Sequence, residues 1–308
     1  MFQMLSRRSC PICSSKESNV LFSIPFSDKK VEEYLTNFYE NRAKLKYLVN
    51  KNYILIECLN CKCIYQKNIL DSDGMRELYE NWAISSEEAT KIKQNSLDNN
   101  SEILKELLVI ISYFKKMPHE LTVLDFGMGS GKWAMIAKAL GCNVYGFDLS
   151  STKMKVGRDN GINCLTYDQI TKLRFDFINT EQVFEHLPEP TQTLQYLSST
   201  LKNDGLIKIS VPFCSSISKR IKKLNWSATK AEKNSLGPIA PLEHINFFRR
   251  ESIIIMGEKA SLKEILIPMK LFYRFNSNWD SLKGVLRNFL LPIYLNILKR
   301  RNYIFLKK

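Results

Sequence analysis

The sequence of 308 residues contains only three histidines and lacks an apolar run long enough to cross a membrane. Its longest apolar run, FLLPIYLNIL at 289–298, is short and is broken by Pro292 and Asn296. The N-terminus MFQMLSRRSCPIC has no apolar stretch of the kind found in secretory signals. We therefore expect a soluble cytoplasmic protein in which the eight cysteines are mostly reduced.

Acidic residues are scarce in the last third of the chain. Residues 202–308 carry 21 Lys and Arg but only 7 Asp and Glu, whereas the first 201 residues carry 24 of each sign. The net charge of +14 therefore belongs to this last third. Such a surplus suits nucleic acid, an anionic membrane or a phosphate-bearing small molecule, and it also serves solubility alone.

Reduced cysteines that occur in clusters favour metal ligands over disulfides. The chain has two C-x2-C pairs with 44 residues between them, Cys10 with Cys13 and Cys58 with Cys61. Two tight turns of this kind can aim four thiolates at one tetrahedral Zn²⁺, which leaves no open position and predicts a structural site. Cys63 is a nearby fifth candidate that could replace Cys61 as a ligand.

Helical patterns dominate the segments around these pairs. Residues 28–49 predict a helix that is followed by a strand at YILIE, residues 53–57. Residues 75–83 have helical character, and 103–117 form an amphipathic helix that Pro118 ends.

A strand, a glycine turn, a helix and a second strand follow Pro118. The strand LTVLDF is followed by GMGSG, the helix KWAMIAKALG and the strand NVYGFD, which together cover 121–148. This order is one unit of a doubly wound α/β fold. Glycines allow the turn to be tight and a ligand to approach the backbone. Asp148, 21 residues after Gly127, is placed to hydrogen-bond the hydroxyls of an adenosine ribose.

The glycine pattern distinguishes between cofactors. A dinucleotide fingerprint needs a third glycine where this chain has Lys132, and no G-x-x-x-x-G-K-[ST] sequence occurs, which argues against a phosphate-binding loop. Here the turn is D-F-G-M-G-S-G, with Asp125 before it. An acid at this place suits a cofactor with a cationic amino-acid end, and S-adenosylmethionine carries such an ammonium group as well as a sulfonium.

Several segments resemble the class I S-adenosylmethionine-dependent methyltransferases, in the bacterial small-molecule branch with E-H-L after the fourth strand. The resemblance covers about 120–267, through VLDFGMGSGKWA, YGFDLS, FDFINTEQVFEHL, LKNDGLIKISVP and HINFF. The cysteine segment is similar to the zinc-binding part of sugar methyltransferases. The resemblance implies a seven-stranded Rossmann-like sheet with a terminal antiparallel hairpin, to which a small N-terminal zinc-binding segment is added.

The resemblance also implies site residues. The cofactor-binding set is Asp125, Gly127, Gly129, Gly131, Asp148, Leu149, Asp168 and Gln182. Within this set Leu149 would lie against the adenine and Asp168 near its amine, although a loop acid such as Asp168 is as readily a solvated one. The candidate substrate contacts are Tyr79, Trp82 and His244.

Glu185 and His186 lie a few residues after the expected fourth strand, RFDFIN at 174–179. Ligands of such sheets bind at the carboxyl ends of the strands, so His186 is the candidate general base for an attacking hydroxyl, with Glu185 beside it. The alternative is that the pair packs and caps a helix start.

Gln182 stands where related quinone O-methyltransferases have the first glutamate of E-x-x-E-H, which argues against a catalytic Mg²⁺ here.

The remaining expectations concern the end of the chain. DGLIKISVP is the fifth strand, KEILIPMKLF at 263–272 the sixth and NYIFLKK the seventh. An insertion at 213–241 covers the acceptor, and the basic, partly apolar segment at 279–300 either contacts a membrane surface or packs in the core with a solvated opposite face. The expected domains are a zinc-binding segment at 1–70, a helical connection or lid at 71–118 and a methyltransferase domain at 119–308.

The sequence thus predicts a methyltransferase that uses S-adenosylmethionine and contains structural Zn²⁺. Its expected acceptor is a small molecule, a sugar, nucleotide sugar or glycan precursor that bears phosphate and is methylated on oxygen. The alternatives are an RNA methyltransferase, a membrane-associated lipid or quinone O-methyltransferase, and a non-catalytic zinc-stapled binding module. DNA is not expected as a partner.

Overall fold

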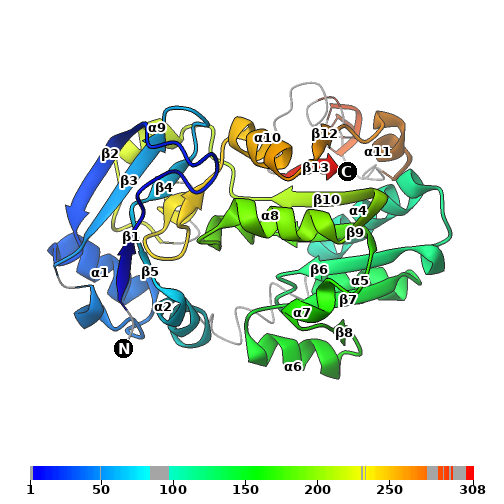
Figure 1. The fold of residues 1–308 in the computed structure, drawn as a ribbon, viewed down its shortest axis with the longest axis horizontal. Helices are drawn as coiled ribbons and strands as arrows, with labels where there is room; N and C mark the ends of the chain where they lie inside the picture. Colours follow the sequence, from blue (N-terminus) through cyan, green and yellow to red (C-terminus); the bar gives the residue numbers. More distant parts are fainter. Residues whose placement is uncertain are drawn as a thin grey trace. The chain divides into compact units, whose positions relative to one another are not determined.

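The computed structural model describes residues 3–48, 50–83, 97–229, 232, 234–275, 284–286, 288–290, 293 and 303–308. The chain divides into two compact units, each built from three separate segments (Figure 1). Unit 1 comprises Met1–Ile84, Gln182–Tyr196 and Val211–Ser261. Unit 2 comprises Ser85–Glu181, Leu197–Ser210 and Leu262–Lys308.

A seven-stranded sheet forms the centre of unit 2, in the order β12-β13-β10-β9-β6-β7-β8. Its strands are β6 (Thr122–Phe126), β7 (Asn143–Phe147), β8 (Asn163–Cys164), β9 (Phe175–Glu181), β10 (Leu201–Ser210), β12 (Lys263–Ile265) and β13 (Tyr303–Lys307). The strands from β10 to β8 pair in parallel, while β13 is antiparallel to both β10 and β12. This is the doubly wound sheet with a terminal antiparallel hairpin that the sequence predicts.

Helices pack against this sheet. They are η3 (Pro118–Glu120), α4 (Leu97–Phe114), α5 (Lys132–Ala139), α6 (Ser151–Asp159), α7 (Tyr167–Ile170) and α11 (Met269–Phe275), and α8 (Pro190–Ser199) follows β9. The helix α4 contacts α5 and α11. Trp133 of α5 stacks on Phe177 of β9, with ring centroids 5.8 Å apart, and Leu107 of α4 is buried in the same apolar core.

The expected sixth strand is shorter than its sequence suggests. The segment KEILIPMKLF pairs with β13 only over Lys263–Ile265, and the chain then enters α11 at Met269. Pro268 explains the change, because it has no N–H to donate to a strand and its carbonyl accepts a bond from Leu271 at the start of the helix.

Unit 1 contains two small sheets. One of their strands is predicted from the sequence. A four-stranded antiparallel sheet has the order β11-β4-β3-β2, and a two-stranded sheet pairs β1 with β5. The strands are β1 (Met4–Ser6), β2 (Ser18–Pro25), β3 (Asn52–Cys58), β4 (Ile64–Gln66), β5 (Asn68–Leu70) and β11 (Asn246–Phe247). β3 is the strand expected from YILIE. Pairing of β11 with β4 joins sequence segments that lie far apart.

Short helices complete unit 1. They are α1 (Lys29–Phe38), η1 (Leu45–Tyr47), α2 (Ser72–Glu77), the π-helix η2 (Leu78–Trp82), η4 (Phe184–His186), α9 (Ile217–Lys222), η5 (Gly237–Ile239) and α10 (Arg250–Lys259). α1 begins where the Asp28 side chain accepts a bond from the Lys30 N–H, as an N-cap does. It ends well before residue 49, because Glu40 and Asn41 adopt positive φ angles of 49° and 63°.

The segment 213–241, expected as an insertion, contributes to the core of unit 1. Trp226 packs edge-on against Tyr34 and Tyr53, with ring centroids 5.7 and 6.1 Å away, and lies 6.3 Å from Phe22. Among the residues described above, we find no helix with the length and apolarity needed to cross a membrane.

Candidate functional site

The glycine turn after β6 is held in a conformation that favours glycine. Gly127, Gly129 and Gly131 have φ angles of 78°, 56° and 79°. The N–H groups of Gly127 and Met128 donate to the Phe147 carbonyl at 2.8 and 2.9 Å. The end of β7 therefore fixes the turn at the carboxyl edge of the sheet, where ligands of such folds bind.

Asp148, the expected ribose acid, supports the turn directly. Its Oδ2 accepts a bond from the Gly129 N–H at 2.9 Å, and its Oδ1 accepts one from the Ser150 N–H at 2.9 Å. Each carboxylate oxygen can accept a further hydrogen bond. The acid is thus held beside the glycine turn with acceptor capacity left for ribose hydroxyls.

Asp125 and Asn179 form a buried polar pair at the ends of neighbouring strands. The Asn179 amide donates to Asp125 Oδ1 at 2.9 Å, and the two side chains are 0 % and 3 % exposed. Within the described part of the chain, Asp125 Oδ2 and Asn179 Oδ1 have no hydrogen-bond partner. Such buried acceptors are costly unless a ligand supplies donors. An ammonium group, which has three donors and no acceptor, fits both.

Burial dominates the protonation of Asp125. Desolvation raises its pKa to about 7, against the hydrogen bond from Asn179 and the positive charge of Lys208, which favour the anion. A cation placed beside this carboxyl group would therefore also decide its charge at neutral pH.

A cavity of about 670 Å³ opens between the glycine turn and the helices of unit 2, a size typical of small-molecule sites. The polar pair and the turn form one part of its wall. The lining residues that matter below are Glu106, Asp125, Gly127, Gly129, Trp133, Asn179, Glu181 and Lys208. Donors of an ammonium group would satisfy the buried acceptors beside the glycine turn, and their contact with S-adenosylmethionine stays a prediction.

The adenosine side is more open. Leu149 is 73 % exposed, so it offers an apolar surface next to Asp148. Asp168 is exposed in the first turn of α7, and it does not line the cavity. Gln182 directly follows β9 and has a positive φ of 53°, which turns the chain at this point. Contact of these three residues with a cofactor stays a prediction.

Glu185, His186 and His244 lie together in unit 1. One ligand atom from each lies within 4.8 Å of the others, and the two imidazole rings have centroids 4.8 Å apart. Glu185 Oε1 is 3.9 Å from His186 Nε2, and Glu185 is fully buried. His186 Nδ1 lies 2.9 Å from the Glu243 carbonyl. A carbonyl only accepts, so Nδ1 carries the proton and Nε2 of the neutral ring is a base.

The two expected aromatic contacts lie in different surroundings. Tyr79 meets the His186 ring edge-on at 5.6 Å, and its buried hydroxyl finds no hydrogen-bond partner among the described residues. Burial, together with Glu243 and Glu185, raises the pKa of Tyr79 well above its usual range, so the hydroxyl stays protonated and can donate. Trp82 is fully buried against Tyr39, 6.1 Å between centroids, and donates to Glu77. Tyr79 thus joins the histidine cluster, while Trp82 packs in the core.

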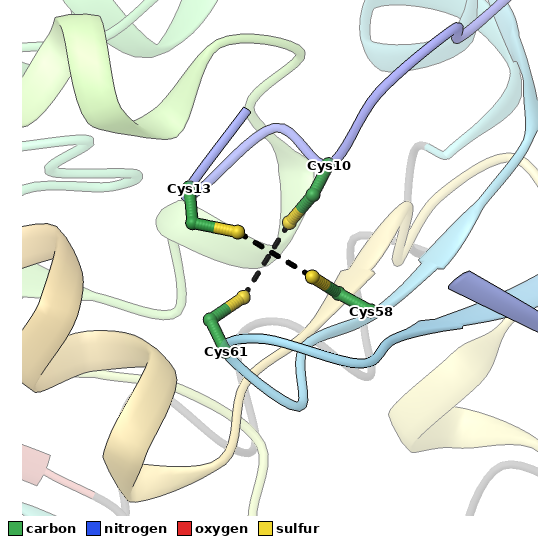
Figure 2. A group of neighbouring side chains, drawn as sticks. All are labelled: Cys10, Cys13, Cys58 and Cys61. Carbon is green, nitrogen blue, oxygen red and sulfur yellow. Dashed lines mark hydrogen bonds between the residues drawn. The ribbon is translucent and has the colours of Figure 1, made fainter. Parts of the chain in front are cut away.

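The four expected cysteines converge. The sulfur atoms of Cys10, Cys13, Cys58 and Cys61 all lie within 4.8 Å of one another, with Cys10–Cys61 and Cys13–Cys58 contacts of 3.4 Å (Figure 2). A tetrahedral Zn²⁺ with Zn–S bonds of about 2.3 Å places its sulfurs ~3.8 Å apart, so the arrangement fits zinc. A hydrogen bond from the Cys61 thiol lowers the pKa of Cys10 to about 5.

Cys63 does not take the place of Cys61. It is fully buried and its thiol points to the Ile64 and Phe247 carbonyls at 3.6 Å, outside the four-cysteine group. Of the two candidates that the sequence leaves open, Cys61 lies in the four-cysteine group, and its role as a ligand stays a prediction.

Two residues of the cavity wall are not predicted from the sequence. Asn179 is an ordinary polar residue near the end of a strand, and its register beside Asp125 shows that the two side chains form a pair. Lys208 lies near the C-terminal end of β10, between two buried isoleucines, yet it is 3 % exposed and lines the cavity. The signal in the sequence is a lysine between the apolar residues of LIKI.

The fold and the glycine-turn cavity define an α/β protein with a nucleotide-type cofactor site. A family profile described as "Methyltransferase domain" matches residues 91–265, more than half of the chain. The chain therefore belongs to the methyltransferase domain family.

Two relatives carry methyltransferase names. The chain is 27 % identical over 158 residues to a ubiquinone biosynthesis O-methyltransferase of Colwellia psychrerythraea, which covers 47 % of this chain and 62 % of the relative. A protein of the same description from Vibrio cholerae is 26 % identical over 176 residues, 51 % of this chain and 70 % of its own length. The chain thus spans less than two thirds of the Colwellia relative.

Among solved structures, the chain resembles the plantazolicin methyltransferase BpumL, whose crystal structure contains a desmethyl analogue and S-adenosylhomocysteine. The two sequences are 14 % identical, the TM-score is 0.46, and the match covers 76 % of this chain and 93 % of that one.

Proposed function

We propose that the protein transfers a methyl group from S-adenosylmethionine to a hydroxyl oxygen of a small molecule. The observation that carries this proposal is the buried Asp125–Asn179 pair, whose two unpartnered acceptors, within the described residues, face a cavity beside the glycine turn. The names of the relatives favour a quinone precursor with a ring hydroxyl as the acceptor over the sugar that the sequence suggests.

The residues of unit 2 bind and orient in this proposal. S-adenosylmethionine supplies an electrophilic methyl group on a sulfonium. Asp125 and Asn179 hold an ammonium group by charge and hydrogen bonds, and Asp148 accepts from ribose hydroxyls while it keeps the glycine turn in place. Much of the rate of an in-line displacement comes from such positioning.

His186 removes the proton of the acceptor hydroxyl in this proposal. Its Nδ1–H is tied to the Glu243 carbonyl, so Nε2 takes the proton. The resulting imidazolium is stabilised by Glu185, whose carboxylate oxygen lies 3.9 Å away. Tyr79 and His244 flank the same ring and are proposed to orient the acceptor.

The four cysteines are proposed to hold a structural zinc ion. All four ligands come from the chain, so the metal would have no open position for a substrate and would stabilise unit 1 without taking part in the reaction.

Calorimetric titration with S-adenosylmethionine tests the function. We expect micromolar binding to the wild-type protein and at least tenfold weaker binding to Asp125→Ala, because the ammonium group would lose its counter-charge. Transfer of a labelled methyl group to a panel of catechols and hydroxyquinones, with sugar nucleotides alongside, would then identify the acceptor. A folded wild-type protein that binds no S-adenosylmethionine would refute the proposal.

The raised pKa of Asp125 predicts that cofactor affinity depends on pH. In the free protein this carboxyl group titrates near pH 7, and an ammonium ligand binds the ionised form better. Binding below pH 7 must therefore expel a proton, so we expect affinity to rise about tenfold from pH 6 to pH 8 and the rise to vanish in Asp125→Asn. The same pH slope in both proteins would show that another group titrates.

A further inference from the structure

Lys208 is a charged residue in the buried second half of a strand. It lies in β10, where its register partners are Asn179 of β9 and Phe305 of β13. Its side chain is nearly inaccessible to solvent and lines the cofactor cavity. An ammonium group in such a place must be compensated, because the transfer of a charge from water is costly.

Two carboxylates compensate it. Lys208 Nζ donates to Glu106 Oε1 and Oε2 at 2.8 and 2.7 Å and to Glu181 Oε2 at 2.7 Å. Burial alone would lower the pKa of Lys208, but the charges of Glu106 and Glu181 outweigh it and raise the pKa, so the ammonium stays charged. Glu106, Lys208 and Glu181 are called the ion triad below.

Further hydrogen bonds fix the two carboxylates of the ion triad. Glu106 Oε1 accepts from the Trp133 indole N–H at 3.2 Å, and Glu181 Oε1 accepts from the Ser210 hydroxyl at 2.7 Å. The triad therefore joins α4, α5 and the strands β9 and β10 around one wall of the cavity. Its geometry is set before any ligand binds.

The ion triad leaves excess negative charge at this wall. Two carboxylates face one ammonium, and Asp125 adds a third carboxyl group to the same cavity. The other charged lining residues are Glu102 and Lys105, which pair with each other at 3.5 Å, and the half-buried Lys132. With Asp125 ionised, the seven charged residues of the lining sum to −1, from four acids and three lysines.

A contribution to folding stability is a weak explanation for these buried charges. Buried ion pairs are often no more stabilising than apolar residues of similar volume. A fixed charge inside a cavity of low dielectric constant does, however, act strongly on a charged ligand. An anionic wall raises affinity for cations and lowers it for neutral or anionic ligands.

We propose that the ion triad selects the charge of the ligand in the cofactor cavity, so that the cationic methyl donor binds more tightly than its neutral product. This inference rests on the proposed function. During methyl transfer the C–S bond breaks with its electron pair on sulfur, an O–C bond forms on the acceptor and the hydroxyl proton leaves to the base. The net charge of the nucleoside falls from +1 to 0. The wall then loses its attraction for the nucleoside, which favours product release.

Three ligands of closely similar shape test the proposal by calorimetry at pH 8, where Asp125 is ionised. They are S-adenosylmethionine, S-adenosylhomocysteine and sinefungin, an analogue with a protonated amine near the sulfonium position. We expect the wild-type protein to bind the two cations at least tenfold more tightly than S-adenosylhomocysteine. Equal affinity for the cations and for S-adenosylhomocysteine would overturn the inference. Failure of all three to bind the folded protein would instead overturn the proposed function.

Substitutions in the ion triad distinguish an effect of its charge from an effect on the fold. Glu106→Gln keeps an acceptor for Lys208 and Trp133 while it removes one negative charge, and Glu181→Gln does the same on β9. Each should weaken binding of both cations about tenfold and leave S-adenosylhomocysteine within twofold of wild type. Asp159→Asn, which removes an exposed acid paired with Lys155 on α6, is the matched control and should change nothing. An equal loss for all three ligands in the Gln variants would show that the triad only maintains the fold.

Discussion

Glutamine in place of His186 should lower kcat for methyl transfer by a factor of about 10² to 10⁴, the usual contribution of a general base. The amide of glutamine is close in size to the imidazole but has no basic nitrogen to take a proton. Affinity for S-adenosylmethionine should stay within twofold of wild type, since the proposed cofactor contacts belong to other residues. Steady-state kinetics and calorimetry on the same preparation measure both quantities.

His119→Gln is the matched control for this substitution. His119 is exposed in η3 and is not a member of the cluster of Glu185, His186 and His244, so its replacement should leave kcat unchanged. Retention of full kcat by His186→Gln would remove the proposed base. Parallel losses of kcat and of thermal stability would instead support the alternative in which the pair merely packs the segment after β9.

The parts of the fold that the sequence predicts are those with local signals. The strands β6 and β9 are buried apolar runs, and the glycine turn between β6 and α5 needs residues with positive φ, so both are readable from short windows. The strands β2 and β11 carry no comparable signal. Most residues of β2 are exposed, and β11 has only two residues, which become a strand by pairing with β4.

The residues of the candidate site likewise divide into those with a local sequence signal and those without one. Asp125 and Asp148 are predictable because each ends a strand next to the glycine turn. The approach of His244 to His186 depends on contacts within unit 1 between segments more than fifty residues apart, so the sequence alone could only name both histidines. The ion triad is less predictable still, because its three residues come from three different elements and only the sheet register shows that Lys208 is compensated.

Replacing Cys61 with serine should release the metal and unfold unit 1. Structural zinc sites in small domains contribute about 10 kcal/mol or more of apparent binding free energy at neutral pH, and a serine hydroxyl is a poor substitute for a thiolate ligand. Cys10 and Cys13 lie in the loop between β1 and β2, and Cys58 and Cys61 lie at and just after the end of β3, so the metal would tie this loop to the pair of strands β2 and β3. We expect about one zinc per wild-type chain by elemental analysis, well under half that in Cys61→Ser, and a Tm at least 10 °C lower.

Cys63→Ser provides the decisive comparison, because it changes a cysteine just two residues away. Its thiol points to backbone carbonyls outside the four-cysteine group, and a serine hydroxyl can donate to the same acceptors. The Cys63→Ser protein should therefore keep its zinc, although burial of a smaller and more polar side chain costs about 1 kcal/mol of unfolding free energy. Loss of zinc in Cys63→Ser with retention in Cys61→Ser would reverse the ligand assignment. A wild-type protein without zinc that melts at the same temperature with and without a chelator would show that the four thiols stabilise unit 1 without a metal.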